Sequence, residues 1–126
     1  MNKKLIYPKR AYELVGACFE VYKKVGNGFT EPVYQECLEI ELELRNIPFE
    51  SQPSLPFFYK GRKTKKRFVP DFICFETIIL EIKALDRLVK ANDSQVLNYL
   101  RATGMRLGIL ANFGHNPKLE YKRLVR

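Results

Sequence analysis

The sequence contains one histidine, three cysteines and no tryptophan. With a single histidine and no CxxC pair, the chain lacks the ligand sets of ordinary zinc and iron–sulfur sites. Any catalytic metal would therefore be held mainly by carboxylates. A GxxxxGK[ST] phosphate-binding loop is also absent from the sequence, which argues against an ATP-driven motor.

Long hydrophobic runs are missing as well. The longest uncharged apolar run is short, around Thr77–Leu80, far below the roughly 20 apolar residues of a membrane helix. The basic segment Met1–Lys4 is not followed by a long apolar stretch, so no signal peptide is predicted. We expect no membrane partner and a cytoplasmic location. Cys18, Cys37 and Cys74 lie in apolar surroundings and are interpreted as buried free thiols of a reducing compartment.

The length and composition are those of one globular unit. The chain has 126 residues, of which 46% are hydrophobic and 29% are charged, and we expect a single domain over residues 1–126. A domain of this size has little surface beyond its site with which to select a substrate. On size alone we therefore expect a homodimer or a larger protein partner.

The charge is strongly positive and unevenly distributed. The net charge is +8, from 22 Lys and Arg against 14 Asp and Glu, which favours an anionic partner, nucleic acid first. Many small basic proteins nevertheless bind nothing charged. Six of the eight residues at positions 60–67 are basic. They are Lys60, Arg62, Lys63, Lys65, Lys66 and Arg67. This basic run is a candidate for binding a nucleic-acid backbone, and the alternative is a solvated hairpin turn.

Apolar spacing and turn residues predict eight elements in the order ααβββαββ, which is an α/β fold. The first helix covers Lys9–Val25. The second runs from a cap at Thr30 or Glu31 to about Arg45, and the third runs from a cap at Asp93 or Ser94 to about Ala102. The five strands are Phe49–Tyr59, Lys66–Cys74, Thr77–Ala84, Met105–Phe113 and Leu119–Val125. The first of these is predicted to be an edge strand, because it contains prolines.

Two charged residues interrupt the apolar strand Ile79–Lys83. Glu81 and Lys83 are two apart, so they share one face of the strand, where unpaired charge is costly. A self-contained ion pair is the alternative, but a buried pair is a poor way to add stability. Asp71 lies amid apolar residues of the preceding predicted strand. If the two strands form a hairpin, Asp71 lies close to Glu81.

Two such carboxylates can bind Mg²⁺ or Mn²⁺ through oxygen, with waters and a substrate phosphate as further ligands. The ammonium of Lys83 can then orient or help to deprotonate a bound water. The geometry sets a condition. A two-residue loop at Glu76-Thr77 would pair Asp71 with Ile82 and turn its side chain away from Glu81. We therefore predict a loop of odd length or a bulge between the strands.

Three motifs resemble those of a known nuclease group. Pro70-Asp71 with Glu81-x-Lys83 resembles the signature of the PD-(D/E)XK nuclease superfamily. Gly28–Tyr34 matches GxxExxY, and Gln95–Tyr99 matches QxxxY. Their order is that of the RecB-type branch, and the closest resemblance is to the small GxxExxY family of stand-alone proteins. It covers nearly the whole chain.

This resemblance implies a restriction-endonuclease-like core, in which a central mixed β-sheet is flanked by helices. It also implies that Asp71 and Glu81 ligate Mg²⁺ or Mn²⁺, with the backbone carbonyl of Ile82 as a further ligand. Lys83 would position the attacking water. Glu31 would aid metal or water binding.

The resemblance further implies that Gln95 and Tyr99 line the site near the substrate. Their spacing of four residues places both on one helix face. Taken alone, Gln95 is as compatible with a solvated position as with the site. Taken alone, Glu31 is more often a charge at a helix N-terminus, and Tyr34 is more often a core residue. Asn92 stands where the family often has a histidine, three residues before the glutamine.

Three functions follow, in decreasing order of support. The first is a Mg²⁺- or Mn²⁺-dependent nuclease that hydrolyses phosphodiester bonds, with DNA favoured over RNA. The second is a catalytically silent module on a nuclease scaffold that binds nucleic acid or protein. The third is a purely structural subunit of a dimer or complex.

Overall fold

The structure is a computed structural model that describes residues 6–126. The basic segment Met1–Lys4 lies outside the described residues. The helices are α1 (Pro8–Val25), α2 (Glu31–Leu44) and α3 (Lys90–Thr103). The strands are β1 (Phe49–Ser51), β2 (Leu55–Tyr59), β3 (Arg62–Phe68), β4 (Phe72–Cys74), β5 (Ile78–Lys83), β6 (Leu107–Asn112) and β7 (Glu120–Val125).

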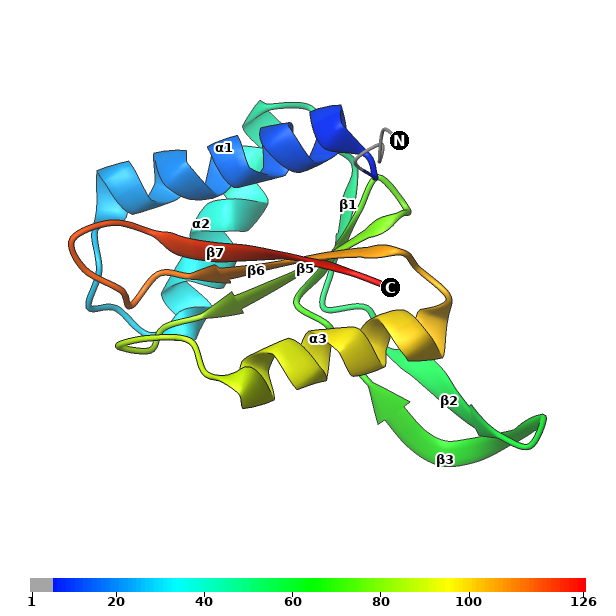
Figure 1. The fold of residues 1–126 in the computed structure, drawn as a ribbon. Coiled ribbons are helices and arrows are strands. Elements are labelled where there is room, and N and C mark those ends of the chain that lie inside the picture. The colour runs from blue at the N-terminus through cyan, green and yellow to red at the C-terminus, as the bar shows by residue number, and fades with distance from the viewer. Residues whose placement is uncertain (1–5) are drawn as a thin grey trace, which may run out of the picture.

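Five strands form a mixed sheet in the order β1-β4-β5-β6-β7. The central pair, β5 and β6, is parallel, and the other neighbours are antiparallel. The helices α1 and α2 cover one face of this sheet, and α3 covers the other (Figure 1). The predicted α/β class, with a central mixed sheet flanked by helices, is confirmed.

The burial pattern of β5 decides which way its charged residues point. Ile78, Leu80 and Ile82 pack with α1 and α2, whereas Ile79 packs with α3. Because side chains alternate along a strand, Glu81 shares the α3 face with Ile79. The same alternation gives Lys83 that face too, so the charged residues of β5 lie on the side covered by α3.

The helix α3 packs directly on β6. Parallel strands need a crossover connection, and α3 supplies the one between β5 and β6. A Cβ added at Gly108 would lie 2.4 Å from Cγ1 of Val96, so glycine permits the close approach of helix and strand. This packing brings the α3 side chains near the end of β5.

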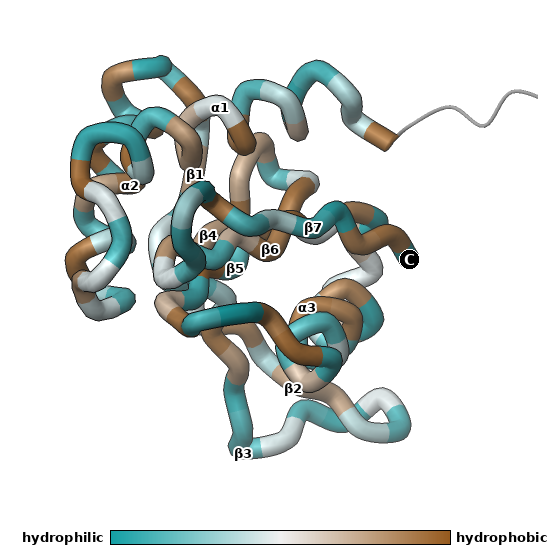
Figure 2. The backbone as a smooth tube through the Cα atoms, turned by 60° about the vertical axis from the view of Figure 1, so that its left-hand side comes forward, coloured by the Kyte–Doolittle hydropathy of each residue, from teal (hydrophilic) through white to brown (hydrophobic). Residues whose placement is uncertain are grey.

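Two of the predicted strands are each divided, so the observed order is ααβββββαββ. The predicted strand Phe49–Tyr59 breaks at Gln52, which has a φ of 49°, and the predicted strand Lys66–Cys74 breaks at Pro70. Pro53 and Pro70 have no N–H to continue a ladder. As a result β2 and β3 leave the main sheet and pair only with each other. They form a projecting hairpin, called here the arm (residues 55–68), whose strand β3 is mostly hydrophilic (Figures 1 and 2).

The start of α3 also differs from the prediction. The helix begins at Lys90 with Val89 as its N-cap, whereas the predicted caps were Asp93 or Ser94. The backbone N–H of Val89 donates a hydrogen bond to Oδ1 of Asn92 at 2.8 Å. The Asn92 side chain therefore satisfies a free donor at the helix N-terminus, a role that sequence analysis did not assign to it.

The cysteines are free, and two of the three are buried as predicted. Cys18 and Cys74 lie in the core, whereas Cys37 is partly exposed, so the prediction was wrong for Cys37. Burial raises the pKa of the Cys18 thiol to about 12 and raises that of Cys74 as well, which keeps both protonated. Among residues 6–126, no helix combines the length and hydropathy needed to cross a bilayer.

Candidate active site

The hairpin between β4 and β5 places Asp71 opposite Glu81. The loop consists of the three residues Phe75–Thr77, and Phe72 pairs with Leu80. One step further along this register, Asp71 faces Glu81. The prediction of an odd loop is confirmed. The backbone accommodates the odd length through positive φ values of 55° at Phe75 and 59° at Glu76.

Each carboxylate is held by a backbone N–H of the opposite segment. The N–H of Asp71 donates to Oε1 of Glu81 at 2.6 Å, and the N–H of Ile82 donates to Oδ2 of Asp71 at 2.8 Å. Glu81 is only 3% exposed. These reciprocal hydrogen bonds fix the two carboxyl groups side by side, and they bring the Ile82 backbone to the border of the site.

The pair is electrostatically unsatisfied. Burial, followed by the negative charge of Asp71, raises the pKa of Glu81 to about 8. The pKa of Asp71 is raised too, first by burial, while the Ile82 N–H opposes the shift. The positive charge of Lys83 lowers both values but does not cancel the effect. A buried carboxylate beside a partly buried one, which resist joint ionisation, would be stabilised by a cation.

A chain of contacts links Lys83 to the arm through α3. Nζ of Lys83 donates to Oε1 of Gln95 at 2.8 Å, and Nε2 of Gln95 donates to the Tyr99 hydroxyl at 3.3 Å. The Tyr99 ring stacks on Phe68, at the end of β3, with centroids 5.4 Å apart. The structure thus brings the predicted residues Gln95 and Tyr99 to Lys83. Burial, followed by the Glu81 charge, raises the pKa of Tyr99.

Glu31 also lies near the carboxylate pair. It is the first residue of α2 and lines, together with Asp71, a cavity of about 480 Å³. Its negative charge contributes to the raised pKa of Asp71. The other residues lining this cavity are Pro32, Gln35, Glu36, Glu39 and Gln52. The cavity is therefore acidic, and it opens on one side of Asp71.

Tyr34, the last residue of the GxxExxY motif, lies in the core as the alternative interpretation held. Its hydroxyl donates to the carbonyl of Gly26 at 2.6 Å and accepts from the N–H of Phe29 at 3.2 Å. Its ring stacks on Phe113 with centroids 4.7 Å apart. These contacts fix the turn between α1 and α2, so Tyr34 positions the helix end that carries Glu31.

Gln35 is a site residue that sequence analysis missed. It is buried, and its Nε2 donates to the backbone carbonyl of Asp71 at 3.0 Å and to Oγ of Ser51 at 2.9 Å. The N–H of Gln52 donates to the same carbonyl at 2.8 Å. The available signal was its position four residues after Glu31, which puts both on one face of α2. Gln35 thus anchors the backbone at Asp71.

The donor set around Asp71 and Glu81 fits a hard divalent cation. Within residues 6–126, no three His, Cys, Asp or Glu side chains are grouped as a metal cage. Mg²⁺, however, is commonly bound through one or two carboxylates, with waters and substrate phosphates as its other ligands. A buried and a partly buried carboxylate that repel each other match that chemistry. Mn²⁺ accepts the same oxygen ligands.

The predicted basic run lies on the arm, apart from the carboxylate pair (Figure 1). All six of its Lys and Arg side chains are exposed. Nε of Arg67 donates to Oγ of Ser54 at 2.6 Å, which ties the base of the arm together. The run therefore forms a charged surface on β3 and the preceding turn.

Comparison with known proteins identifies the group to which this geometry corresponds. Residues 8–124 match the PD-(D/E)XK nuclease superfamily. No curated protein matches the chain. The crystal structure of SSO0001 is similar in fold, with a TM-score of 0.59 and 19% sequence identity over 95% of this chain. The chain spans 57% of the length of that protein. Because the family match covers nearly the whole sequence and the fold agrees with it, the chain belongs to the PD-(D/E)XK nuclease superfamily.

Proposed function

We propose that this chain is a Mg²⁺- or Mn²⁺-dependent nuclease that hydrolyses phosphodiester bonds, with DNA favoured over RNA. The observation that carries this proposal is the interlocked pair Asp71–Glu81 on the same sheet face as Lys83. Membership in a nuclease superfamily supports it. We further propose the GxxExxY family, in the RecB-type branch, on the motifs that contain Glu31 and Gln95.

In this proposal Asp71 and Glu81 are the main metal ligands, with the Ile82 carbonyl and Glu31 as further ones. A bound Mg²⁺ would lower the pKa of a bound water and offset charge on the scissile phosphate. The chain's own residues do the positioning. Lys83, held by its hydrogen bond to Gln95, would hold the attacking water at its ammonium group.

Nucleic acid is the proposed partner. Gln95 and Tyr99 would contact the substrate beside the carboxylates, and the exposed basic run of the arm would bind the phosphate backbone at a distance from them. Such phosphate contacts add affinity that falls with salt concentration and carry no sequence information. Specificity for one sequence is therefore not expected from the arm.

Cleavage of labelled oligonucleotides tests the proposal. Single-stranded DNA, double-stranded DNA and RNA would each be incubated with Mg²⁺, Mn²⁺ or EDTA. We expect metal-dependent cleavage that falls by at least about a hundredfold in both Asp71→Asn and Lys83→Met. Asp86→Asn and Lys90→Met change exposed residues of the same types and should cleave like the wild type.

A different result would support the second function. If the folded wild type cleaves none of the substrates with either metal but still binds nucleic acid, the chain is a binding module on a nuclease scaffold. If the two site variants cleave as fast as their matched controls, the activity does not reside in this carboxylate pair, and the proposal is wrong.

A further inference from the structure

The arm carries three consecutive aromatic residues that are poorly covered. Phe57 is 45% exposed, Phe58 is 56% exposed and Tyr59 is 64% exposed. Rings on β2 thus lie beside the exposed Lys and Arg side chains of β3, its pairing partner. Exposed apolar groups that cluster in this way mark interaction sites more often than isolated ones do.

A groove separates these rings from α3. A cavity of about 480 Å³ is lined by Pro56, Phe57 and Phe58 on the arm and by Asn98, Arg101 and Ala102 on the helix. In a regular strand Phe57 and Phe58 would point to opposite faces. The register of β2 and β3 shifts between Pro56 and Phe58, and such an irregularity allows both rings to border the groove.

The chemistry of the groove fits unpaired nucleobases. Its residues within the described chain are aromatic, aliphatic, amide or guanidinium groups, with no carboxylate among them. Aromatic rings stack on bases of any sequence, and a neighbouring guanidinium can bind phosphate or stack as well. In a duplex the base faces are already stacked on each other, so rings of this kind reach bases mainly in single strands.

The groove is connected to the candidate active site. Asn98 precedes Tyr99 on α3, and the Tyr99 ring stacks on Phe68 at the base of the arm. Tyr99 in turn accepts a hydrogen bond from Gln95, which binds Lys83. A strand that leaves the groove past Tyr99 therefore meets the residues proposed to cleave it.

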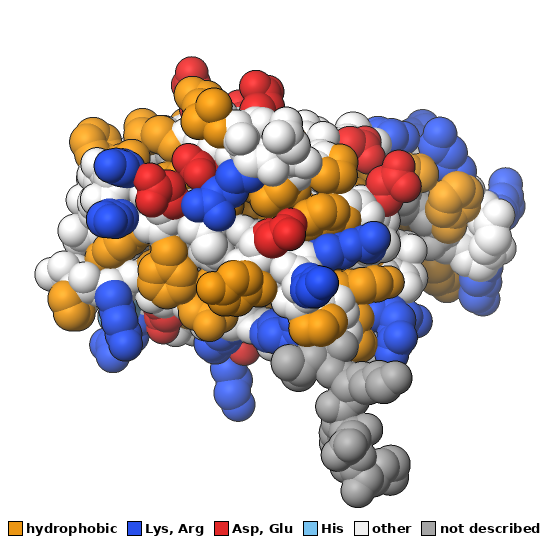
Figure 3. Space-filling view, turned by 90° about the horizontal axis from the view of Figure 1, so that it is seen from above, with side chains coloured by type: hydrophobic (Ala, Val, Ile, Leu, Met, Phe, Trp, Pro, Cys, Tyr) orange, Lys and Arg blue, Asp and Glu red, His pale blue; other side chains and the backbone are white. Residues whose placement is uncertain are grey.

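The opposite surface of the molecule lacks this combination. The face over α1 also exposes aromatic residues, including Tyr12 and Phe19, but acidic and basic side chains are interspersed among them (Figure 3). Glu13 and Arg45 line the cavity beside them. Aromatic rings next to a surface of one charge sign are thus a property of the arm.

Resting on the proposed function, we infer that the arm and α3 form a groove that binds single-stranded nucleic acid through its bases. Phe57 and Phe58 stack on unpaired bases, while Arg101 and the basic run contact the phosphates. The substrate class would accordingly be single strands or the unpaired ends of duplexes.

Fluorescence anisotropy in EDTA tests this inference without cleavage. Three labelled DNA oligomers of equal length would be compared at one salt concentration: a single strand, a duplex, and a single strand with abasic spacers that keeps its phosphates. For the double variant Phe57→Ala/Phe58→Ala we expect at least about tenfold weaker binding of the base-bearing single strand. Binding of the duplex and of the abasic oligomer should change less than about twofold.

Matched variants separate stacking from charge and from misfolding. Tyr12→Ala removes an aromatic side chain that is 81% exposed on α1, and it should leave all three affinities unchanged. Lys65→Ala should weaken all three about equally, because it removes only a phosphate contact. If the alanine double variant does not fold, Phe58→Leu keeps an apolar side chain without a ring and should still weaken binding of the single strand selectively.

The inference would be overturned if Phe57→Ala/Phe58→Ala and Phe58→Leu weakened binding of base-bearing and abasic strands equally. It would also be overturned if neither of these two variants weakened binding. Tight binding of the wild type to a protein or peptide, with none to single strands, would also overturn it and identify a different occupant. The two proposals fail separately. Base-dependent binding without cleavage would contradict only the nuclease proposal, and cleavage with base-independent binding would contradict only the groove.

Discussion

The two central strands each bury a polar residue, but the two residues are treated in opposite ways. β5 carries Glu81, 3% exposed, and the neighbouring β6 carries Asn112, which is fully buried. Asn112 is paired in register with Lys83, so both polar environments lie at the same end of the sheet. The amide is completely hydrogen-bonded, whereas Glu81 has another carboxyl group as its neighbour. The first arrangement leaves no polar atom of the amide unpaired, and the second places side by side two carboxyl groups that resist joint ionisation.

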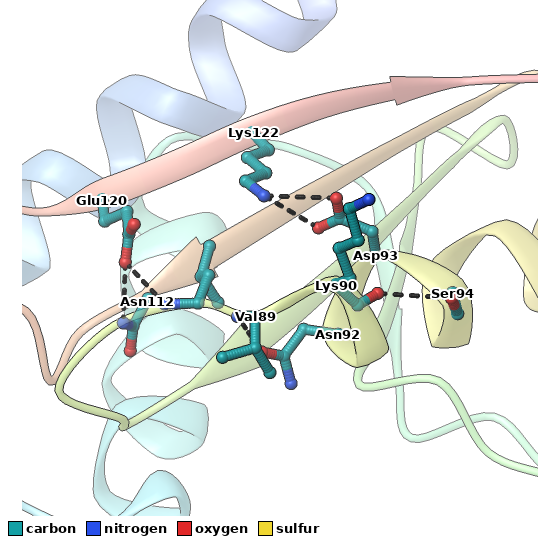
Figure 4. A network of polar contacts seen from close by, with 9 residues as sticks. Val89, Lys90, Asn92, Asp93, Ser94, Asn112, Glu120 and Lys122 are labelled. Atoms are coloured by element: carbon teal, nitrogen blue, oxygen red, sulfur yellow. Dashed lines mark hydrogen bonds and ion pairs between the residues drawn. The ribbon is translucent and has the colours of Figure 1, made fainter.

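Asn112 uses all of its hydrogen-bonding capacity. Its Oδ1 accepts from the N–H of Leu85 at 2.9 Å and from that of Gly114 at 3.2 Å. Its Nδ2 donates to the carbonyl of Leu85 at 2.9 Å and to Oε1 of Glu120 at 3.0 Å. The contact with Glu120 is drawn in Figure 4. One side chain thereby joins the end of β5, the end of β6 and the start of β7.

The same network reaches the beginning of α3. Oε1 of Glu120 also accepts from the N–H of Leu88 at 3.0 Å, and Nζ of Lys122 lies 3.1 Å from Oδ1 of Asp93 (Figure 4). A Cβ at Gly114 would lie 2.5 Å from the backbone of Leu85, so only glycine fits there. These contacts hold the segment that leads from Lys83 to the helix carrying Gln95.

The largest effect on stability is expected for Asn112→Leu, which removes the fully hydrogen-bonded amide. It leaves part-buried backbone groups of Leu85 and Gly114 without their partner, which should lower the free energy of unfolding by about 3 kcal/mol. Urea unfolding followed by circular dichroism measures the change. Asn98→Leu alters an exposed asparagine and should stay within about 0.5 kcal/mol of the wild type. Equal stabilities for the two variants would show that the network is not stabilising.

Changing the pH should reveal how the carboxyl pair Asp71–Glu81 affects stability. The pKa of Glu81 is raised from 4.5 to about 8, so in EDTA the folded chain keeps a proton that the unfolded chain releases. Its contribution to stability is fully present below pH 4.5 and is lost as the pH rises through about 8. The free energy of unfolding should therefore fall across this window, and Glu81→Gln should flatten the fall.

Two measurements sharpen that result. Glu50→Gln changes an exposed glutamate and should leave the slope against pH unaltered. Added Mg²⁺ or Mn²⁺ should raise stability most at the alkaline end, because metal binding requires the ionised carboxylates. A wild type whose stability rises between pH 4.5 and 8 in EDTA would contradict the raised pKa of Glu81.

Gln35→Leu tests a residue that combines the two arrangements. Gln35 is a hydrogen-bonded amide, and it holds the backbone of Asp71, a member of the carboxyl pair. Its hydrogen bond to the Asp71 carbonyl is lost, but Gln52 still donates to that atom. We expect about tenfold weaker Mn²⁺ binding, or an equal loss of cleavage, with little change in stability. Ser51→Ala removes the other partner of Gln35, together with the hydrogen bond that Oγ of Ser51 donates to Glu39, and should bind Mn²⁺ like the wild type. Similar effects of the two variants would show that Gln35 does not position Asp71.

The placement of the charged residues on β5 was predictable from the sequence. Glu81 and Lys83 interrupt an apolar strand, and a spacing of two fixes their common face whatever surrounds them. The same face requirement led to the prediction of an odd loop or a bulge, and the loop Phe75–Thr77 has three residues. The helices followed from apolar periodicity, apart from the start of α3, where the Asn92 side chain replaces the expected cap.

Contacts between distant segments were not predictable in this way. Gln35 reaches the Asp71 carbonyl across 36 positions of sequence, and Asn112 reaches Leu85 across 27. No sequence pattern around either residue predicts its hydrogen-bond partner, because a single amide side chain has no periodicity. The division of two predicted strands, which frees the arm, likewise depends on where the chain turns away from the sheet.

The sequence by itself determined the α/β class and the residues that carry the charge, because periodicity and side-chain chemistry are local properties. Only the tertiary structure decided which charges meet. It interlocked Asp71 with Glu81, tied Lys83 to Gln95, and set the aromatic side of the arm against α3. The physical reason is that hydrogen bonds and burial act through space, so the environment that raises the pKa of a carboxyl group exists only in the folded chain.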